Sequence, residues 1–207
     1  MRVAAARIYL TKHKNFPRIA AITLGALGKA HETHEAAAAA VGSPRYTRLI
    51  LAFTRWLQAR GWRDTLSVKA RKCLARPVPP FAEAVLAQRR QRLHKRARGL
   101  ADASAPMRHR LRIAAKKSRY ATEFFAALYS AKKIRRYVDA LSALQDVLGR
   151  SNDAAVAAGL VAQLQDEQAA ASDAAGFVRG YLAAQGVHDA KQIIRRWKRL
   201  DGVKPPM

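Results

Sequence analysis

Apolar side chains recur along most of the chain at the three- and four-residue spacing of an amphipathic α-helix. The clearest case lies within residues 45–60, where five apolar side chains share one helical face: Leu49, Ile50, Phe53, Trp56 and Leu57. No segment sustains the two-residue alternation that is typical of a half-buried strand. The pattern therefore predicts an all-α protein, a bundle of helices.

Turn-forming residues divide this pattern into separate helices. We expect helices over residues 2–11, 17–41, 45–60, 65–74, 81–98, 107–129, 132–148, 151–172, 173–185 and 188–200. Asp64 or Thr65 is expected to cap the fourth helix, and Ser104 the sixth. Gly61 and Gly149 are expected to end the helices that precede them.

Two further local sequence signals indicate how the chain is divided. The residues 151–153, Ser-Asn-Asp, are good N-cap residues that begin two positions after Gly149, so a new helix is expected there. The segment 76–80 reads Arg-Pro-Val-Pro-Pro and should form a rigid break. We expect it to separate an N-terminal half, residues 1–76, from a C-terminal half, residues 77–207.

Composition adds a strong charge imbalance to this helical picture. The chain has 207 residues, half of them hydrophobic, so it can bury a sizeable core. It carries 39 Lys and Arg against 14 Asp and Glu, a net charge of +25. The field of such a protein attracts nucleic acid, anionic lipid or another polyphosphate.

Several protein classes are disfavoured by what the sequence contains. A single cysteine, Cys73, excludes an internal disulfide framework and a cysteine-rich zinc site. No apolar run approaches the length of a membrane span, and the first residues do not resemble a signal peptide. We expect a soluble, basic, cytoplasmic protein that does not enter a membrane.

The positive charge is concentrated in one part of the chain. Residues 86–119 contain twelve Lys and Arg and one acid, Asp102, whereas residues 141–190 carry a net charge of −4. In the helix expected at 107–129, four cationic or titratable side chains fall within an arc of roughly 80°: His109, Arg112, Lys116 and Arg119. The preceding helix repeats this spacing with Arg89, Arg92 and Arg96. If the two helices are antiparallel neighbours, the two columns can face one groove.

Three runs of sequence resemble one known family. Residues 109–120 read H-x-x-R-I-x-x-K-K-x-R-Y and are followed by Glu123-Phe-Phe; residues 144–153 read L-Q-D-x-L-G-x-x-N-D; residues 43–49 read S-P-R-Y-T-R-L. Together they resemble the CHAD family, the conserved histidine α-helical domain, over most of the chain from about Gly42. The resemblance implies two related four-helix halves around a basic groove that binds inorganic polyphosphate. It also implies frequent fusion to a CYTH-type triphosphate-tunnel domain.

The first half resembles the second only in part. The motif 27–32, L-G-K-A-H-E, stands where 148–153 does, and Arg2 and Arg7 are placed like Arg112 and Lys117. However, Ala6 and Tyr9 occupy the places of a lysine and an arginine, and no histidine precedes Arg2. The spacing from Arg2 to the motif glycine is 26 residues, against 37 in the second half. We expect a shortened first half that binds less strongly, in a chain that is a fragment or a degenerate copy.

These observations predict non-enzymatic binding of inorganic polyphosphate. The expected binding residues are His109, Arg112, Lys116, Lys117, Arg119, Tyr120, Arg89, Arg92 and Arg96, with lesser contributions from Arg45, Arg48, Arg2 and Arg7. His109 can donate to a phosphate and becomes a cation on protonation. Tyr120 either hydrogen-bonds phosphate or fills the core, and Glu123 is expected to pair with a neighbouring cation.

The sequence contains no visible catalytic apparatus and no convincing metal site. It has no Gly-rich phosphate loop and no ExExK signature, and the His31-Glu-Thr-His34-Glu35 run lacks the i, i+4 histidine spacing of a zinc helix. We therefore expect neither a cofactor nor a metal. The expected partners are polyphosphate, polyphosphate granules and a CYTH-type domain. The alternative is a DNA- or RNA-binding basic protein, although Trp56, Trp62 and Trp197 are not interleaved with the basic column as stacking platforms.

Overall fold

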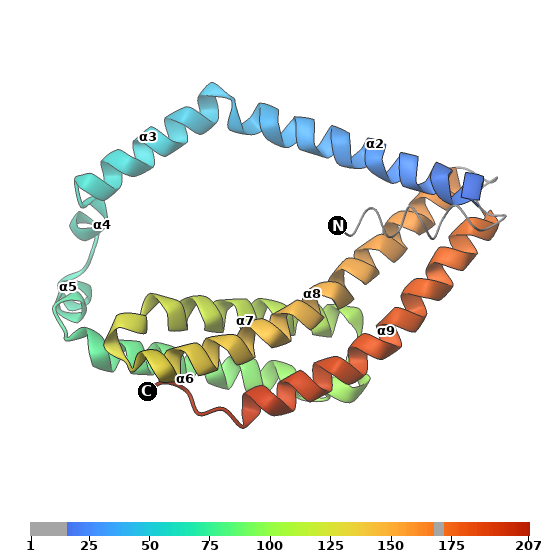
Figure 1. Cartoon of the computed structure of the whole chain (residues 1–207). Coiled ribbons are helices and arrows are strands. Elements are labelled where there is room, and N and C mark those ends of the chain that lie inside the picture. The colour runs from blue at the N-terminus through green and yellow to red at the C-terminus, as the bar shows by residue number, and fades with distance from the viewer. Residues whose placement is uncertain (1–15, 168–171) are drawn as a thin grey trace. The chain divides into compact units, whose positions relative to one another are not determined.

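The computed structural model describes residues 16–167 and 172–207, and every regular element among them is helical (Figure 1). The predicted all-α class is therefore confirmed. The chain divides into two compact units, residues 1–77 and 78–207. The pseudo-symmetry expected between the two halves stays a prediction.

The first unit contains α2 (Phe16–Val41), α3 (Pro44–Gln58), α4 (Gly61–Asp64) and α5 (Val68–Leu74). Ser43 caps α3, because its hydroxyl accepts a hydrogen bond of 3.2 Å from the Tyr46 amide. Ser67 caps α5 in the same way through the Ala70 amide, at 3.2 Å. The caps expected at Asp64 or Thr65 are wrong, because Asp64 ends the single turn of α4.

Gly61 begins a helical turn rather than ending α3, which already stops at Gln58. A Cβ at this position would lie 2.6 Å from Cδ1 of Trp56, so only glycine fits beside the indole ring. The preceding residue, Arg60, adopts the left-handed conformation with φ of 53° and turns the chain. The glycine is thus required by a close contact with an aromatic side chain.

The second unit contains α6 (Val78–Ala97), η1 (Leu100–Asp102), α7 (Ala105–Phe124), η2 (Ala126–Leu128), α8 (Ala131–Glu167) and α9 (Ser172–Asp201). α6 begins three residues earlier than predicted, because Pro79 and Pro80 fit the first turn of a helix. Gly99, with φ of 67°, provides the left-handed turn that ends this helix. α7 ends at Phe124 rather than Tyr129, and Ser104 stands at its N-cap position without a side-chain cap.

The predicted helix end at Gly149 and the caps at 151–153 are wrong, because α8 continues through this segment. Glycine inside a helix costs about 1 kcal/mol relative to alanine. Packing on both sides offsets that cost, since Leu148 and Ser151 are buried. The expected break between 185 and 188 is also wrong, because α9 passes through Gly186 without interruption.

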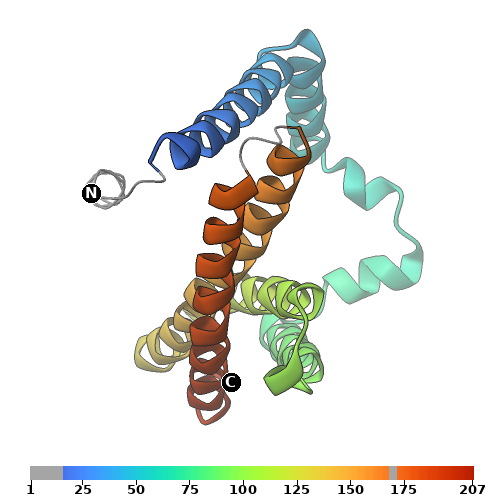
Figure 2. The same ribbon diagram turned by 90° about the vertical axis from the view of Figure 1, so that its right-hand side faces the viewer.

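The core of the second unit lies where α7 and α9 pack against α8 and where α6 packs against α7. Its largest fully buried side chains are Leu93, Leu111, Leu141, Leu144, Leu148, Ile193 and Leu200. Figures 1 and 2 both show α8 and α9 side by side along much of their length. Burying a leucine contributes about 1.5–3 kcal/mol, so this cluster positions α7 firmly.

The last turn of α9 is tied to α6 by polar contacts. The guanidinium of Arg90 donates to the carbonyl oxygens of Val203 at 3.1 Å and Asp201 at 3.3 Å. The imidazole of His94 lies 3.5 Å from the Asp201 carboxylate and meets the Trp197 ring edge-on. α6 is therefore held against α7 on one side and the end of α9 on another.

Candidate anion-binding surfaces

α7 carries cationic side chains on both sides of a buried stripe. The stripe consists of Leu111, Ala115, Ser118 and Thr122, which are buried in the second unit. At about 100° per residue, His109, Arg112, Lys116 and Arg119 lie on one flank of this stripe. These four residues are named the α8-side face. Arg110, Ile113, Ala114 and Lys117 lie on the other flank, toward α6.

Two contacts place the α8-side face beside α8. The Nδ1 atom of His109 lies 2.7 Å from Oδ1 of Asn152, so the imidazole donates from Nδ1 to the amide oxygen. The Nε atom of Arg112 lies 3.8 Å from the place where a Cβ on Gly149 would stand. The two motif segments of the sequence, 109–120 and 144–153, therefore meet along this face.

Arg119 is held by neighbours on its own helix. Its Nε atom lies 3.7 Å from a carboxylate oxygen of Glu123, which confirms the expected pairing of that glutamate. Its guanidinium carbon lies 5.1 Å from the centre of the Tyr120 ring, at cation–π distance. Tyr120 is 50% exposed, so it does not fill the core. In contrast, neither Arg112 nor Lys116 has an acidic partner in the part of the chain that the structure describes.

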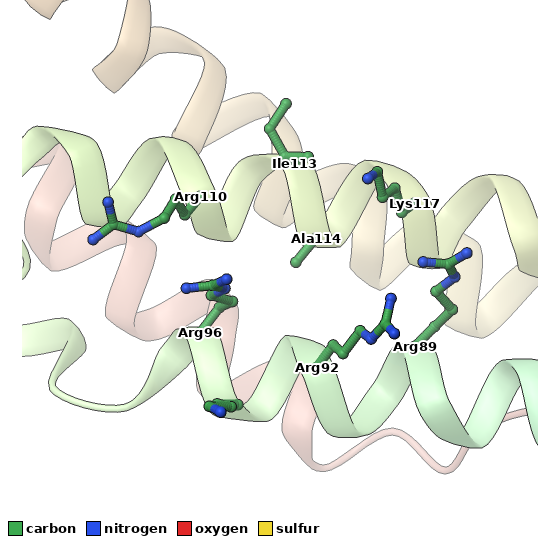
Figure 3. A pocket seen from close by; sticks show the side chains of 8 residues that line it. Arg89, Arg92, Arg96, Arg110, Ile113, Ala114 and Lys117 are labelled. Atoms are coloured by element: carbon green, nitrogen blue, oxygen red, sulfur yellow. The ribbon is translucent and has the colours of Figure 1, made fainter.

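A pocket of about 430 Å³ lies between α6 and α7 (Figure 3). Six of its lining side chains are cationic: Arg89, Arg92, Lys95, Arg96, Arg110 and Lys117. Ile113 and Ala114 complete the lining, which includes no acid. Figure 3 shows the side chains of Arg89, Arg92 and Arg96 extending from α6 toward α7. This set of eight residues is named the α6–α7 pocket.

The two predicted cationic columns do not line one groove. Arg89, Arg92 and Arg96 line the α6–α7 pocket, but none of the four residues of the predicted α7 column joins them; of the other predicted binding residues on α7, Lys117 does. The α8-side face lies on the other flank of α7. Lys95 and Arg110 line the pocket and were not predicted. The i, i+7 spacing of Arg110 and Lys117, with Ile113 and Ala114 between them, could have indicated this second flank.

The predicted residues of the first unit are not gathered into a described site. Arg45 and Arg48 are exposed on α3, and Nε of Arg48 donates to the Pro44 carbonyl oxygen at 3.3 Å. Arg2 and Arg7 lie outside the described residues. In the His31-Glu-Thr-His34-Glu35 run, Nε2 of His31 lies 3.2 Å from a carboxylate oxygen of Glu35 on the same helix, α2. This contact gives His31 a structural role.

A metal site and a membrane-spanning helix are both absent from the described residues. Within 16–167 and 172–207, no three His, Cys, Asp or Glu side chains gather so as to hold a metal ion. None of the described helices is long and apolar enough to cross a membrane.

Comparison with known proteins identifies the fold. The family model of the CHAD domain matches residues 3–162. A crystal structure of the CHAD domain from the plant Ricinus communis is 35% identical in sequence and superposes with a TM-score of 0.71. The match covers 87% of this chain and 59% of the plant chain, so this chain spans about three fifths of that relative. A search of curated proteins finds no match. The chain belongs to the CHAD domain family.

Proposed function

We propose that this protein binds inorganic polyphosphate and does not turn it over. The observation that carries the proposal is the α8-side face, on which Arg112 and Lys116 have no acidic partner among the described residues. Cations on successive turns lie about 5.4 Å apart along the helix axis. A linear phosphate chain carries roughly one charge per unit, so it can follow such a row while each arginine bridges two oxygens.

The side chains on these surfaces suit binding better than catalysis. The α6–α7 pocket is lined by guanidinium and ammonium groups with Ile113 and Ala114, and its lining includes no carboxylate, imidazole or thiol. On the α8-side face the Nδ1 atom of His109 is engaged by Asn152. The proposal therefore assigns electrostatic capture to both surfaces and no chemical step.

Other parts of the proposal follow from the family alone. The chain is proposed to act in the cytoplasm, to associate with polyphosphate granules and to work beside a CYTH-type triphosphate-tunnel domain. Weak nucleic-acid binding is proposed as a consequence of the net charge of +25.

The test compares two variants that lose the same charge. The site variant carries glutamine at six positions: Arg112, Lys116, Arg119, Arg92, Arg96 and Arg110. The control variant carries glutamine at six exposed positions elsewhere in the second unit: Lys132, Lys133, Arg135, Lys191, Arg195 and Lys204. Long-chain polyphosphate should bind the control within a few-fold of the parent protein and should bind the site variant at least tenfold more weakly. Equal affinities for the two variants would reject the proposal.

Competition distinguishes polyphosphate from the nucleic-acid alternative. At equal phosphate concentration, polyphosphate should displace duplex DNA, because DNA spaces its charges on a wide, stiff helix, whereas a phosphate chain can follow a row of cations on one helix. Among the aromatic residues, Tyr120 and Phe124 are exposed on α7, and Trp197 packs partly buried on the core. Displacement of polyphosphate by DNA would favour the alternative.

A further inference from the structure

The α6–α7 pocket is a concentration of positive charge without compensation. None of its six cationic side chains makes an ion pair or a side-chain hydrogen bond within the described residues. The Nε atom of Arg89 is one of four arginine Nε atoms that are buried without a hydrogen-bond partner among the described residues, and it leaves a donor free to meet an anion.

The pocket and the α8-side face are separated on the solvent side by an apolar ridge. Ile113, which also lines the pocket, and Tyr120 lie between the cations of the two surfaces around α7, and Phe124 continues this apolar strip one turn further; they are 36%, 50% and 81% exposed. Counted around the helix, the centres of the two surfaces are roughly 140° apart. A phosphate chain lying along one surface therefore cannot contact the other without crossing the ridge.

We propose that the α6–α7 pocket is a second, separate binding site for oligophosphate, so that one protein chain joins two polyphosphate strands. This inference rests on the proposed function, because it takes the α8-side face as the first site. The pocket suits a bent or terminal segment of a phosphate chain, since its cations come from two helices and converge on one volume of about 430 Å³. The α8-side face suits an extended segment, because its cations form a row along one helix.

The experiment is a sandwich assay with two populations of long-chain polyphosphate. One population is attached to beads, the protein is added and washed, and a fluorescent population is then offered in solution. The parent protein should stay on the beads and capture the fluorescent strands. The pocket variant R92Q/R96Q/R110Q and the face variant R112Q/K116Q/R119Q should each stay on the beads and capture no more fluorescence than beads without protein.

The control variant K132Q/K133Q/R135Q loses the same charge outside both surfaces and should capture as much as the parent protein. Undiminished capture by the pocket variant would overturn the inference, because bridging would then not need the pocket. A parent protein that stays on the beads but captures nothing would overturn it as well, and would leave the proposed function standing. A parent protein that does not stay on the beads would reject the proposed function itself. Circular dichroism confirms that each variant is folded.

Discussion

The contact between His109 and Asn152 determines which nitrogen of the imidazole is available to a ligand. Because Nδ1 donates to the amide oxygen at 2.7 Å, the neutral ring leaves Nε2 as an acceptor, which does not bind phosphate oxygen. Only the protonated ring offers a donor at Nε2. Asn152 therefore fixes the orientation of the ring and leaves Nε2 as the nitrogen that can meet a ligand.

Replacing Asn152 by alanine should weaken this arrangement measurably. The lost hydrogen bond should lower the free energy of unfolding by about 0.5–1.5 kcal/mol, as judged by denaturant titration. In a double-mutant cycle, Asn152→Ala should cost much less when His109 is already alanine, because no partner is then left to lose. Fully additive losses would show that the two side chains do not interact.

Arg119 and Arg89 show how much of the site the local sequence could reveal. Arg119 pairs with Glu123 at i+4, a contact that helical spacing alone predicts. Arg89 faces a pocket whose other wall is formed by Arg110 and Lys117, which lie 21 and 28 residues further along the chain. Its surroundings depend on the rotation of α7 about its own axis. That rotation is set by the burial of Leu111 and Ala115, which charge spacing does not encode.

At the scale of the helix, α8 shows that tertiary packing can override a local helix-stop signal. The run Gly149-Arg-Ser-Asn-Asp is a strong signal for one helix to end and another to begin, yet α8 continues through it. The glycine lies opposite the Arg112 side chain. Its neighbours Val147 and Leu148 are buried in the core that α8 forms with α7 and α9. The helical conformation of every long element was therefore predictable from periodicity. Whether a helix ends at Gly149 or Gly186 was not, because that depends on packing against residues distant in sequence.

Two glycine substitutions should change stability in opposite directions. At Gly149 an alanine Cβ would lie 3.8 Å from Arg112 Nε, an ordinary contact, so G149A should raise the free energy of unfolding by up to about 1 kcal/mol. At Gly99 the left-handed φ of 67° disfavours any Cβ, so G99A should lower it by about 1 kcal/mol. Thermal and denaturant unfolding measure both. A destabilised G149A would mean that the glycine is needed for the approach of Arg112.

At the scale of the whole molecule, the net charge of +25 acts separately from the contacts. A long-range field accelerates the encounter with a polyanion, whereas close contacts determine how long the complex lasts. The pocket, face and control triple variants each lose three charges, which leaves 25 − 3 = +22 in every case. The field around the three proteins is therefore nearly the same, although their binding surfaces differ.

The three triple variants should accordingly share one association rate and differ in dissociation. At low salt, association with fluorescent polyphosphate should slow by less than about tenfold in all three, and by a similar factor. Dissociation of polyphosphate should be unchanged in K132Q/K133Q/R135Q. It should be faster in the pocket variant and in the face variant, in each case at the surface whose cations have been replaced. Stopped-flow mixing measures both rates. An association rate that falls only in the pocket and face variants would show that local patches, not the overall field, steer the ligand.

The ridge of Ile113, Tyr120 and Phe124 has a consequence for how this protein can change over generations. Substitutions on opposite flanks of α7 that are far apart and share no partner should have effects that are close to additive. A lineage can therefore lose or retune one flank while the other keeps its affinity. The same helix can then be inherited in versions with two, one or altered attachments, and the buried stripe that folds it stays untouched.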